Sequence, residues 1–355
     1  MNRTAVKANV DDNCFDIIRL VCTFTVFLGH FLTHFQVDPP LLHSIAYFVR
    51  GVPVFFFLSG LFIPRSLERY DTGEYLRRRA VRIFPELWVC VLINLGIIMV
   101  CLRGAYSLKD ILIYLATQLT AFQFYTGGWL RGYGVGVPNG ALWTISVDIQ
   151  FYIAAIFLSR YLKGKGIKAW NSAIAVGMLL DLALEKGANF YPEIGYSLLQ
   201  CSLIPFVWIF LIGMCVYYQR DRIIPFIVRY RWAFVVAYFV WALLVPDSVR
   251  MLFSGMRYNL VTTVLLLLMV MGLGFSFRKR LRSDYSYSFY LYHMVVINFI
   301  IHNICRRFAS PGTFVLVLTV SFLAIGTLAV LSHRYVAGSL TRANQRKPAT
   351  GKAEH

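Results

Sequence analysis

The chain has 355 residues, 58% of them hydrophobic, and a formal net charge of +18. Its apolar residues fall in runs of roughly 18–25, the length that crosses a hydrocarbon core of ~30 Å, and this excludes an ordinary soluble protein. Because the Lys and Arg residues lie in the short connections between these runs, the charge indicates membrane topology and anionic membrane lipids as partners, and not nucleic acid.

We predict an all-α polytopic membrane protein with about ten transmembrane helices. In chain order, the predicted spans are 16–36, 45–64, 83–102, 142–160, 169–186, 194–218, 232–246, 258–277, 287–305 and 313–336. An eleventh apolar segment, 109–124, is shorter and carries polar residues. A single transmembrane domain is expected over residues 1–340, followed by a basic, disordered cytoplasmic tail over 341–355.

The basic residues predict which ends of the spans face the cytoplasm. The connection 65–82 carries six arginines, which places it inside together with the N-terminus. If 109–124 does not cross the membrane, about 25 of the 35 basic residues face the cytoplasm and about 8 face out. We therefore expect both termini in the cytoplasm and the protein in the inner (plasma) membrane. The Gly- and aromatic-rich segment 103–141 is then the largest non-cytoplasmic feature.

Two absences from the sequence narrow its function. The seven cysteines contain no CxxC pattern and lie mostly inside apolar runs. They are typical of small core side chains, so we expect neither a disulfide framework nor a metal site. No internal repeat is visible, which disfavours the secondary transporters that are built from two related halves.

The first predicted span carries four ionisable residues, Asp16, Arg19, His30 and His34. Such groups are costly at membrane depth and usually face a protein interior or a water-filled cavity. Arg19 and His30 are eleven residues apart, so they share one helix face and lie about 16 Å apart along its axis. Asp16 can pair with Arg19 at i, i+3. His30 suits proton transfer near neutral pH; a packing role is the alternative, and the arginine on its face favours catalysis.

Polar groups recur in the next two spans. Ser59 and Gly60 form a small pair among aromatic residues, which suits either close helix packing or a narrow slot for a ligand. Arg79 and Arg82 lie at i, i+3 on the cytoplasmic side, an arrangement that suits phosphate, although some neighbouring arginines serve only as topology signals.

Two later spans add further ionisable groups. Asp148 follows Trp143 in the fourth span, where a carboxylate suits ordering an acceptor hydroxyl, assisting a base, or a structural pairing with Arg50. These functional and structural interpretations of Asp148 are about equally favoured. His293 lies about two turns inside the ninth span, where a hydrogen-bonded packing role is slightly favoured over function.

These elements together resemble the acyltransferase-3 family of bacterial membrane O-acyltransferases, and they follow the family's order along nearly the whole chain. Asp148 stands where most members have Glu. The last span ends Ser332-His333-Arg334, without the Glu-x-Pro often found there. The matching elements are Arg19-x10-His30 preceded by Asp16, the stretch 51–60, Arg79 to Pro85, Asn139 to Thr144 followed by Asp148, and Tyr287 to His293.

The resemblance implies transfer of an acyl group, usually acetyl from acetyl-CoA, from the cytoplasmic side to a hydroxyl of a cell-surface polysaccharide or lipid-linked glycan. On this hypothesis arginines hold the CoA phosphates, the pantetheine arm passes the Ser59–Gly60 pair, and His30 acts as general base or carries the acyl group. The implied catalytic residues are His30, Arg19 and Asp148; the donor-binding residues are Arg79, Arg82, Ser59 and Gly60, with Arg19 as a further phosphate contact; secondary candidates are Asp16, Trp143 and His293.

A different class of function remains open at this point. In a proton-coupled glycan or lipid transporter or flippase, His30, Arg19 and Asp148 would form a proton or substrate pathway. Thioester-dependent activity separates the two classes. The sequence leaves the acceptor sugar, the acyl length and the oligomeric state open.

Overall fold

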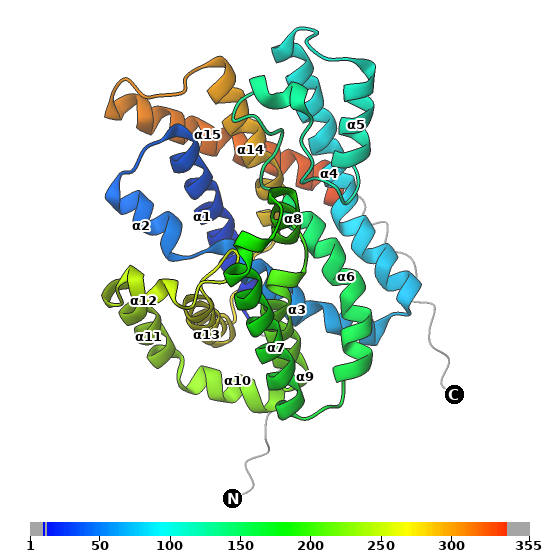
Figure 1. The fold of residues 1–355 in the computed structure, drawn as a ribbon, viewed down its shortest axis with the longest axis vertical. Helices are drawn as coiled ribbons and strands as arrows, with labels where there is room; N and C mark the ends of the chain where they lie inside the picture. Colours follow the sequence, from blue (N-terminus) through cyan, green and yellow to red (C-terminus); the bar gives the residue numbers. More distant parts are fainter. Residues whose placement is uncertain (1–9, 11–12, 339–355) are drawn as a thin grey trace, which may run out of the picture. The chain divides into compact units, whose positions relative to one another are not determined.

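A computed structural model describes residue 10 and residues 13–338, and these residues are helical, without a β-strand (Figure 1). The expected disordered tail over 341–355 lies outside the described residues. The helices divide between two compact units. Within the described residues, unit 1 comprises 10–33, 37–72 and 143–284, and unit 2 comprises 34–36, 73–142 and 285–338.

Unit 1 contains more of the described helices than unit 2 does. They are α1 (Phe15–Phe35, whose last residues belong to unit 2), α2 (Pro40–Phe48), α3 (Gly51–Arg69), α6 (Trp143–Leu162), α7 (Ile167–Lys186), η2 (Ala188–Phe190), α8 (Glu193–Gln200), η3 (Ile204–Phe206), α9 (Val207–Tyr218), α10 (Arg220–Arg229), α11 (Arg231–Leu244), α12 (Asp247–Met251) and α13 (Leu260–Ser276).

Unit 2 is built around α14, which is buried along nearly all of its length. Its helices are α4 (Thr72–Leu102, whose first residue belongs to unit 1), α5 (Leu108–Gln118), η1 (Gly128–Gly132), α14 (Ser286–Asn303), α15 (Pro311–Ser332) and the π-helical turn η4 (His333–Ala337).

The described residues contain 6 helices that are long and apolar enough to cross a membrane, or up to 8 if each bent pair counts as one span. This supports a multi-pass membrane protein, with fewer such helices than the ten expected spans. The shortfall comes from α13, which is a shorter apolar helix of 17 residues, and from α14, which falls outside this set. The segment expected at 109–124 forms α5, whose 11 residues extend about 16 Å and so fall short of a hydrocarbon core.

Two expected spans are interrupted. The span expected at 45–64 is divided into α2 and α3 by extended backbone at Val49 and Arg50. Pro53 lies in the first turn of α3, where its missing N–H is tolerated. The span expected at 194–218 bends by 45° between α8 and the helix that begins at Ile204.

The core of unit 1 depends on close contact between α3 and α9. A Cβ atom on Gly60 would overlap the carbonyl of Phe210, and one on Gly213 would overlap the carbonyl of Phe57, so glycine at both positions lets the two backbones approach. Next to this contact the rings of Phe151 and Phe210 stack with centroids 4.4 Å apart. Small residues and aromatic rings therefore fix how α3, α6 and α9 pack.

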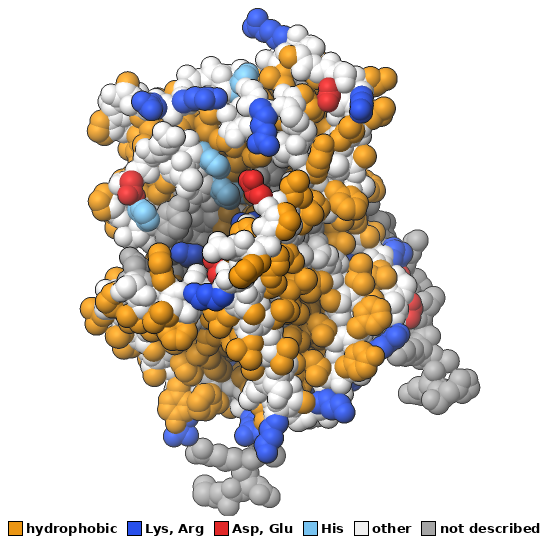
Figure 2. All heavy atoms as spheres, viewed as in Figure 1, with side chains coloured by type: hydrophobic (Ala, Val, Ile, Leu, Met, Phe, Trp, Pro, Cys, Tyr) orange, Lys and Arg blue, Asp and Glu red, His pale blue; other side chains and the backbone are white. Residues whose placement is uncertain are grey.

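Unit 1 has two chemically different ends. At the Lys163 end, the Lys163 ammonium lies 2.9 Å from the Glu68 carboxylate, and the Gln219 amide donates to the Lys165 carbonyl at 3.0 Å. These bonds bring the C-termini of α3, α6 and α9 together. The opposite end, the Trp143 end, contains the N-termini of α3 and α6 and the 253–260 loop. Figure 2 shows hydrophobic side chains over the region of α7 and a gathering of Lys and Arg at the end where Figure 1 places α10.

Candidate active site

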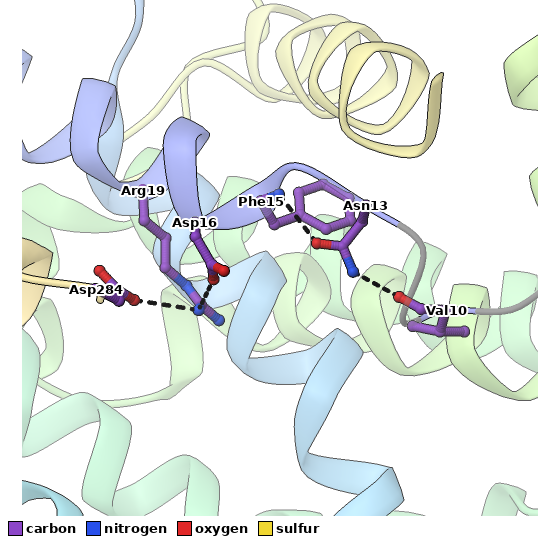
Figure 3. A network of polar contacts seen from close by, with 6 residues as sticks. All are labelled: Val10, Asn13, Phe15, Asp16, Arg19 and Asp284. Carbon is purple, nitrogen blue, oxygen red and sulfur yellow. Dashed lines mark hydrogen bonds and ion pairs between the residues drawn. The ribbon is translucent and has the colours of Figure 1, made fainter. Parts of the chain in front are cut away.

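Arg19 on α1 is held between two carboxylates of unit 1 (Figure 3). Its Nη1 lies 3.3 Å from Asp16 Oδ1, as the i, i+3 spacing predicted, and 3.5 Å from Asp284 Oδ2 after α13. Its guanidinium also lies 5.2 Å from the centre of the Phe62 ring. Asn13 starts the helix, because its side chain accepts from the Phe15 N–H and donates to the Val10 carbonyl. These contacts explain how the charge of Arg19 is balanced in unit 1 without a ligand.

His30 lies on the same helix, well away from that network. The α1 helix is continuous from Phe15 to Phe35, so the eleven residues between Arg19 and His30 correspond to about 16 Å along the axis. The His30 side chain is half-buried, whereas the side chains of Phe31 and Phe35 after it on α1 are buried. The predicted arrangement of an arginine and a histidine on one face, three turns apart, is thus present.

Ser59 and Asp148 are brought together, as partners from α3 and α6. The Ser59 hydroxyl donates to Asp148 Oδ1 at 3.2 Å. Within the described residues no ion pair joins Arg50 to Asp148, so the structural alternative proposed for this carboxylate is replaced by a bond to serine. Gly60, next to Ser59, is buried against α9, and close helix packing accounts for it without a ligand.

Helix geometry separates the Ser59–Asp148 pair from His30. A Cβ on Gly51 would meet the Cys22 carbonyl, so α1 and α3 cross there, and the Phe15 and Phe62 rings touch further along, which makes the helices antiparallel. Ser59 lies about 12 Å from the crossing in one direction and His30 about 12 Å from it in the other. His30 and Asp148 therefore lie apart within unit 1, and their predicted catalytic roles stay predictions.

Trp143 begins α6 at the Trp143 end of unit 1. Its ring packs against that of Phe206, with centroids 5.5 Å apart, and the Arg257 guanidinium lies 4.4 Å above its centre. Arg257 was not among the predicted residues. Its position 114 residues after Trp143 leaves no local spacing from which the contact could be read.

In unit 2, the arginines at the start of α4 have different partners. Glu74 forms ion pairs with Arg77 at 2.7 Å and with Arg78 at 2.6 Å. Arg79 lies 5.6 Å from the centre of the Tyr75 ring, and Arg82 is exposed one turn later. Of the arginines on α4, Arg77 and Arg78 are thus paired with Glu74, and Arg82 is exposed.

A buried carboxylate that the sequence analysis missed lies on the same face of α4. Glu86, one turn after Arg82, is 2% exposed and accepts from the Ser288 hydroxyl at 2.6 Å. His333 Nδ1 lies 3.9 Å from its other oxygen. The available signal was a carboxylate inside an apolar run, which usually marks a paired or functional group.

The 139–142 and 287–293 segments hold each other in unit 2. The Asn139 amide donates to the Leu291 carbonyl at 2.8 Å, and the Tyr290 hydroxyl donates to the Ala141 carbonyl at 2.9 Å. His293 is buried on α14, with Nδ1 2.6 Å from the Tyr290 carbonyl, as expected for a packing histidine. Two segments that are about 150 residues apart in the sequence are thus joined by hydrogen bonds in unit 2.

The 103–141 segment contains a small cavity near α5. Its empty volume is about 170 Å³, below the ~300–1,000 Å³ of typical ligand pockets. The lining residues are Ile113, Tyr114, Thr117, Gln118, Tyr125, Gly127, Trp129 and Leu130. No group of three or more His, Cys, Asp or Glu side chains in the described part of the chain could hold a metal ion.

Comparison with known proteins decides the family. The model of a family described as an acyltransferase domain, acyltransferase-3, matches residues 12–331. The chain belongs to the acyltransferase-3 family. It is also 26% identical over 220 residues to "Nodulation protein 10" of Rhizobium leguminosarum bv. viciae, covering 57% of this chain and 58% of that protein. The chain therefore aligns with little more than half the length of this relative. No solved structure matches it.

The elements that the chain shares with this family can now be located in the structure. The elements Asp16 to His30, 51–60 and Trp143 to Asp148 meet inside unit 1. The elements Arg79 to Pro85 and Tyr287 to His293 meet inside unit 2, where the Tyr287 hydroxyl donates to the Ile83 carbonyl at 3.0 Å. The family elements thus divide between the two units, and the element Asn139 to Asp148 contributes residues to both.

Proposed function

We propose that this chain is an acyltransferase that moves an acetyl group from acetyl-CoA to a hydroxyl of a cell-surface polysaccharide or lipid-linked glycan. We further propose that it crosses the inner membrane ten times, with both termini in the cytoplasm. The observation that carries the proposal is the continuous α1 helix, which holds His30 three turns from the Arg19 ion-pair network. Family membership supplies the acyl-transfer chemistry.

His30 is the residue assigned to proton transfer. Its imidazole takes the proton of the acceptor hydroxyl while that oxygen attacks the thioester carbonyl. The C–O bond forms, the C–S bond breaks, and the imidazolium returns the proton to the CoA thiolate. A variant of this scheme has His30 carry the acyl group between donor and acceptor, and it uses the same residue.

Arg79 and Arg82 are assigned to the CoA phosphates. Guanidinium groups bind phosphate through paired, charge-assisted hydrogen bonds. Arg19 is not assigned to this task, because Asp16 and Asp284 already neutralise its charge. The Ser59–Asp148 pair is assigned to positioning within unit 1 and not to direct contact with the base.

The test is mass spectrometry of surface glycans from cells with the intact gene, without it, and with His30→Ala. We expect a mass step of one acetyl group only with the intact gene. His43→Ala is the matched control, since His43 on α2 is an exposed histidine that is paired with Asp38. If His30→Ala keeps the modification while the protein stays folded, the assigned role is wrong. A glycan of unchanged mass whose export changes would indicate a transporter instead.

A further inference from the structure

The 253–260 loop lies at the Trp143 end and is held in place by hydrogen bonds. The Gly255 N–H donates to the Tyr258 carbonyl at 3.0 Å, and the Leu260 N–H donates to the Phe253 carbonyl at 2.9 Å. The loop is tied to α7, because the Met256 N–H donates to Asp181 Oδ1 at 3.0 Å. A Cβ on Gly255 would overlap the Asp181 carboxylate, so only glycine allows this approach. The loop therefore presents Arg257 in a fixed position.

Arg257 has a charge that no carboxylate balances. Within residues 13–338 it makes no ion pair, and its buried Nε donates no hydrogen bond. Two acidic side chains of α7 have other partners: Asp181 accepts from the Met256 N–H and from Trp208 Nε1, and Glu185 accepts from the Tyr196 hydroxyl at 2.8 Å. The guanidinium is held instead over the face of Trp143, beside the Cys201 thiol.

A second unbalanced arginine lies at the same end. Arg50 precedes α3, is exposed, and likewise makes no ion pair within the described residues. The Phe56 ring of α3 lies 6.3 Å from the Trp143 ring at the start of α6, and the Phe206 ring contacts both Trp143 and Tyr258 of the loop. These ring contacts place Arg50, directly before α3, and Arg257, over Trp143, at the same end of unit 1.

Two like charges without a counter-charge repel each other, and partial burial of one of them adds a desolvation cost. Cations at membrane depth are usually paired or face a site for a charged ligand. A carboxylate or phosphate can accept two parallel N–H bonds from each guanidinium and would remove both costs. His30 and Trp143 lie towards this same end of unit 1, away from Lys163.

We propose that Arg257 and Arg50 form an anion-binding subsite that holds a carboxylate or phosphate group of the glycan acceptor. The acceptor is therefore an acidic glycan, either one with uronic acid residues or one bearing a phosphate. That the bound anion belongs to the acceptor rests on the proposed function; that the arginines bind an anion does not.

The test measures thermal unfolding of the purified full chain in detergent with increasing glucuronate, inorganic phosphate or glucose, at constant ionic strength. Glucuronate or phosphate should raise the unfolding temperature saturably, and glucose should not. The acid that binds more tightly identifies the group on the acceptor. Arg257→Gln should weaken binding by about tenfold or more, and Arg50→Gln by less, because Arg50 is exposed.

The matched control is Arg229→Gln, which removes an arginine that also lies over an aromatic ring, 5.6 Å from the centre of Tyr230. It should leave anion binding unchanged. If Arg257→Gln does not fold, Arg257→Lys keeps the charge, loses the paired geometry, and should still weaken binding. The proposal fails if no anion gives a saturable shift, or if the shift survives in Arg257→Gln.

His30→Ala separates this proposal from the proposed function. Its anion-dependent shift should equal that of the unchanged protein while transfer is lost. If transfer persists in His30→Ala but anions still bind through Arg257, the assigned catalytic role fails and the subsite stands. Nanodiscs that contain anionic phosphatidylglycerol should stabilise the unchanged protein and Arg257→Gln equally. If they stabilise only the unchanged protein, the arginines bind lipid headgroups, and the proposed role in acceptor binding is wrong.

Discussion

At the scale of single residues, Arg19 joins the start of α1 to the segment after α13. Its two carboxylate partners come from positions 16 and 284, and all three side chains are partly buried. Removing the arginine leaves two carboxylates close together without a cation. The cost should therefore appear mainly in folding, because the repulsion acts whether or not a donor is bound.

Arg19→Ala should destabilise the protein by about 1–3 kcal/mol. The measurement is thermal unfolding in detergent together with the Kd of acetyl-CoA. We expect a lower unfolding temperature and an unchanged Kd. An unchanged unfolding temperature with a weaker Kd would show instead that Arg19 contacts the donor phosphates.

The arginines of α4 allow a matched comparison, because only some of them are paired with Glu74. Arg79→Ala and Arg82→Ala should each raise the Kd of acetyl-CoA about tenfold or more, the effect of losing a charge-assisted hydrogen bond. Arg77→Ala should change it little, since Arg77 is exposed and bonded to Glu74. Equal effects for all three would indicate a general electrostatic attraction without specific phosphate contacts.

At the scale of helices, the α3–α9 contact sets the geometry around Ser59. Gly60 and Gly213 face the opposing backbone with no room for a side chain. A single methyl group there must push the helices apart, and this would also lengthen the bond between Ser59 and Asp148. The element Gly51 to Gly60 is therefore explained first by packing.

Gly60→Ala should lower stability by about 1–3 kcal/mol, and Gly213→Ala by a similar amount. The control is Gly96→Ala on α4, where an added Cβ meets nothing within 4 Å. That change should be neutral or stabilising by up to about 1 kcal/mol, because alanine restricts the unfolded chain. Thermal unfolding in detergent compares the three, and equal effects would refute the packing explanation.

At the scale of the whole molecule, the distribution of charge predicts orientation. The Lys163 end of unit 1 gathers Lys163 and Lys165 with the C-termini of α3 and α9, and α10 adds further arginines. Bonds within unit 1 require these basic segments to lie on the same side of the membrane. The positive-inside rule predicts that this side is the cytoplasmic one. The Trp143 end should then face away from the cytoplasm.

Single cysteines in a background without the native cysteines test this orientation. Lys165→Cys should react with a membrane-impermeant maleimide only after the cells are permeabilised. Phe190→Cys, at a position that is 88% exposed beyond the other end of α7, should react in intact cells. The reverse pattern would invert the protein and place His30 towards the cytoplasm.

The sequence by itself determined the helical membrane class, the family elements and the local pairs. Asp16 and Arg19 meet because three residues of helix bring them to one face, and His30 shares that face for the same reason. The number of continuous spans was less predictable, because hydropathy does not report a break such as the one at Val49 and Arg50.

Tertiary structure alone decided which distant groups meet. Asp284 joins Arg19, Ser59 joins Asp148, and Arg257 covers Trp143 across 265, 89 and 114 residues of chain. Such contacts depend on which helices pack together, and helical periodicity gives a side chain's direction on its own helix without naming the helix it faces. For this reason the sequence placed His30 on the first span and Asp148 on the fourth, but it could not show that Ser59 is the partner of Asp148.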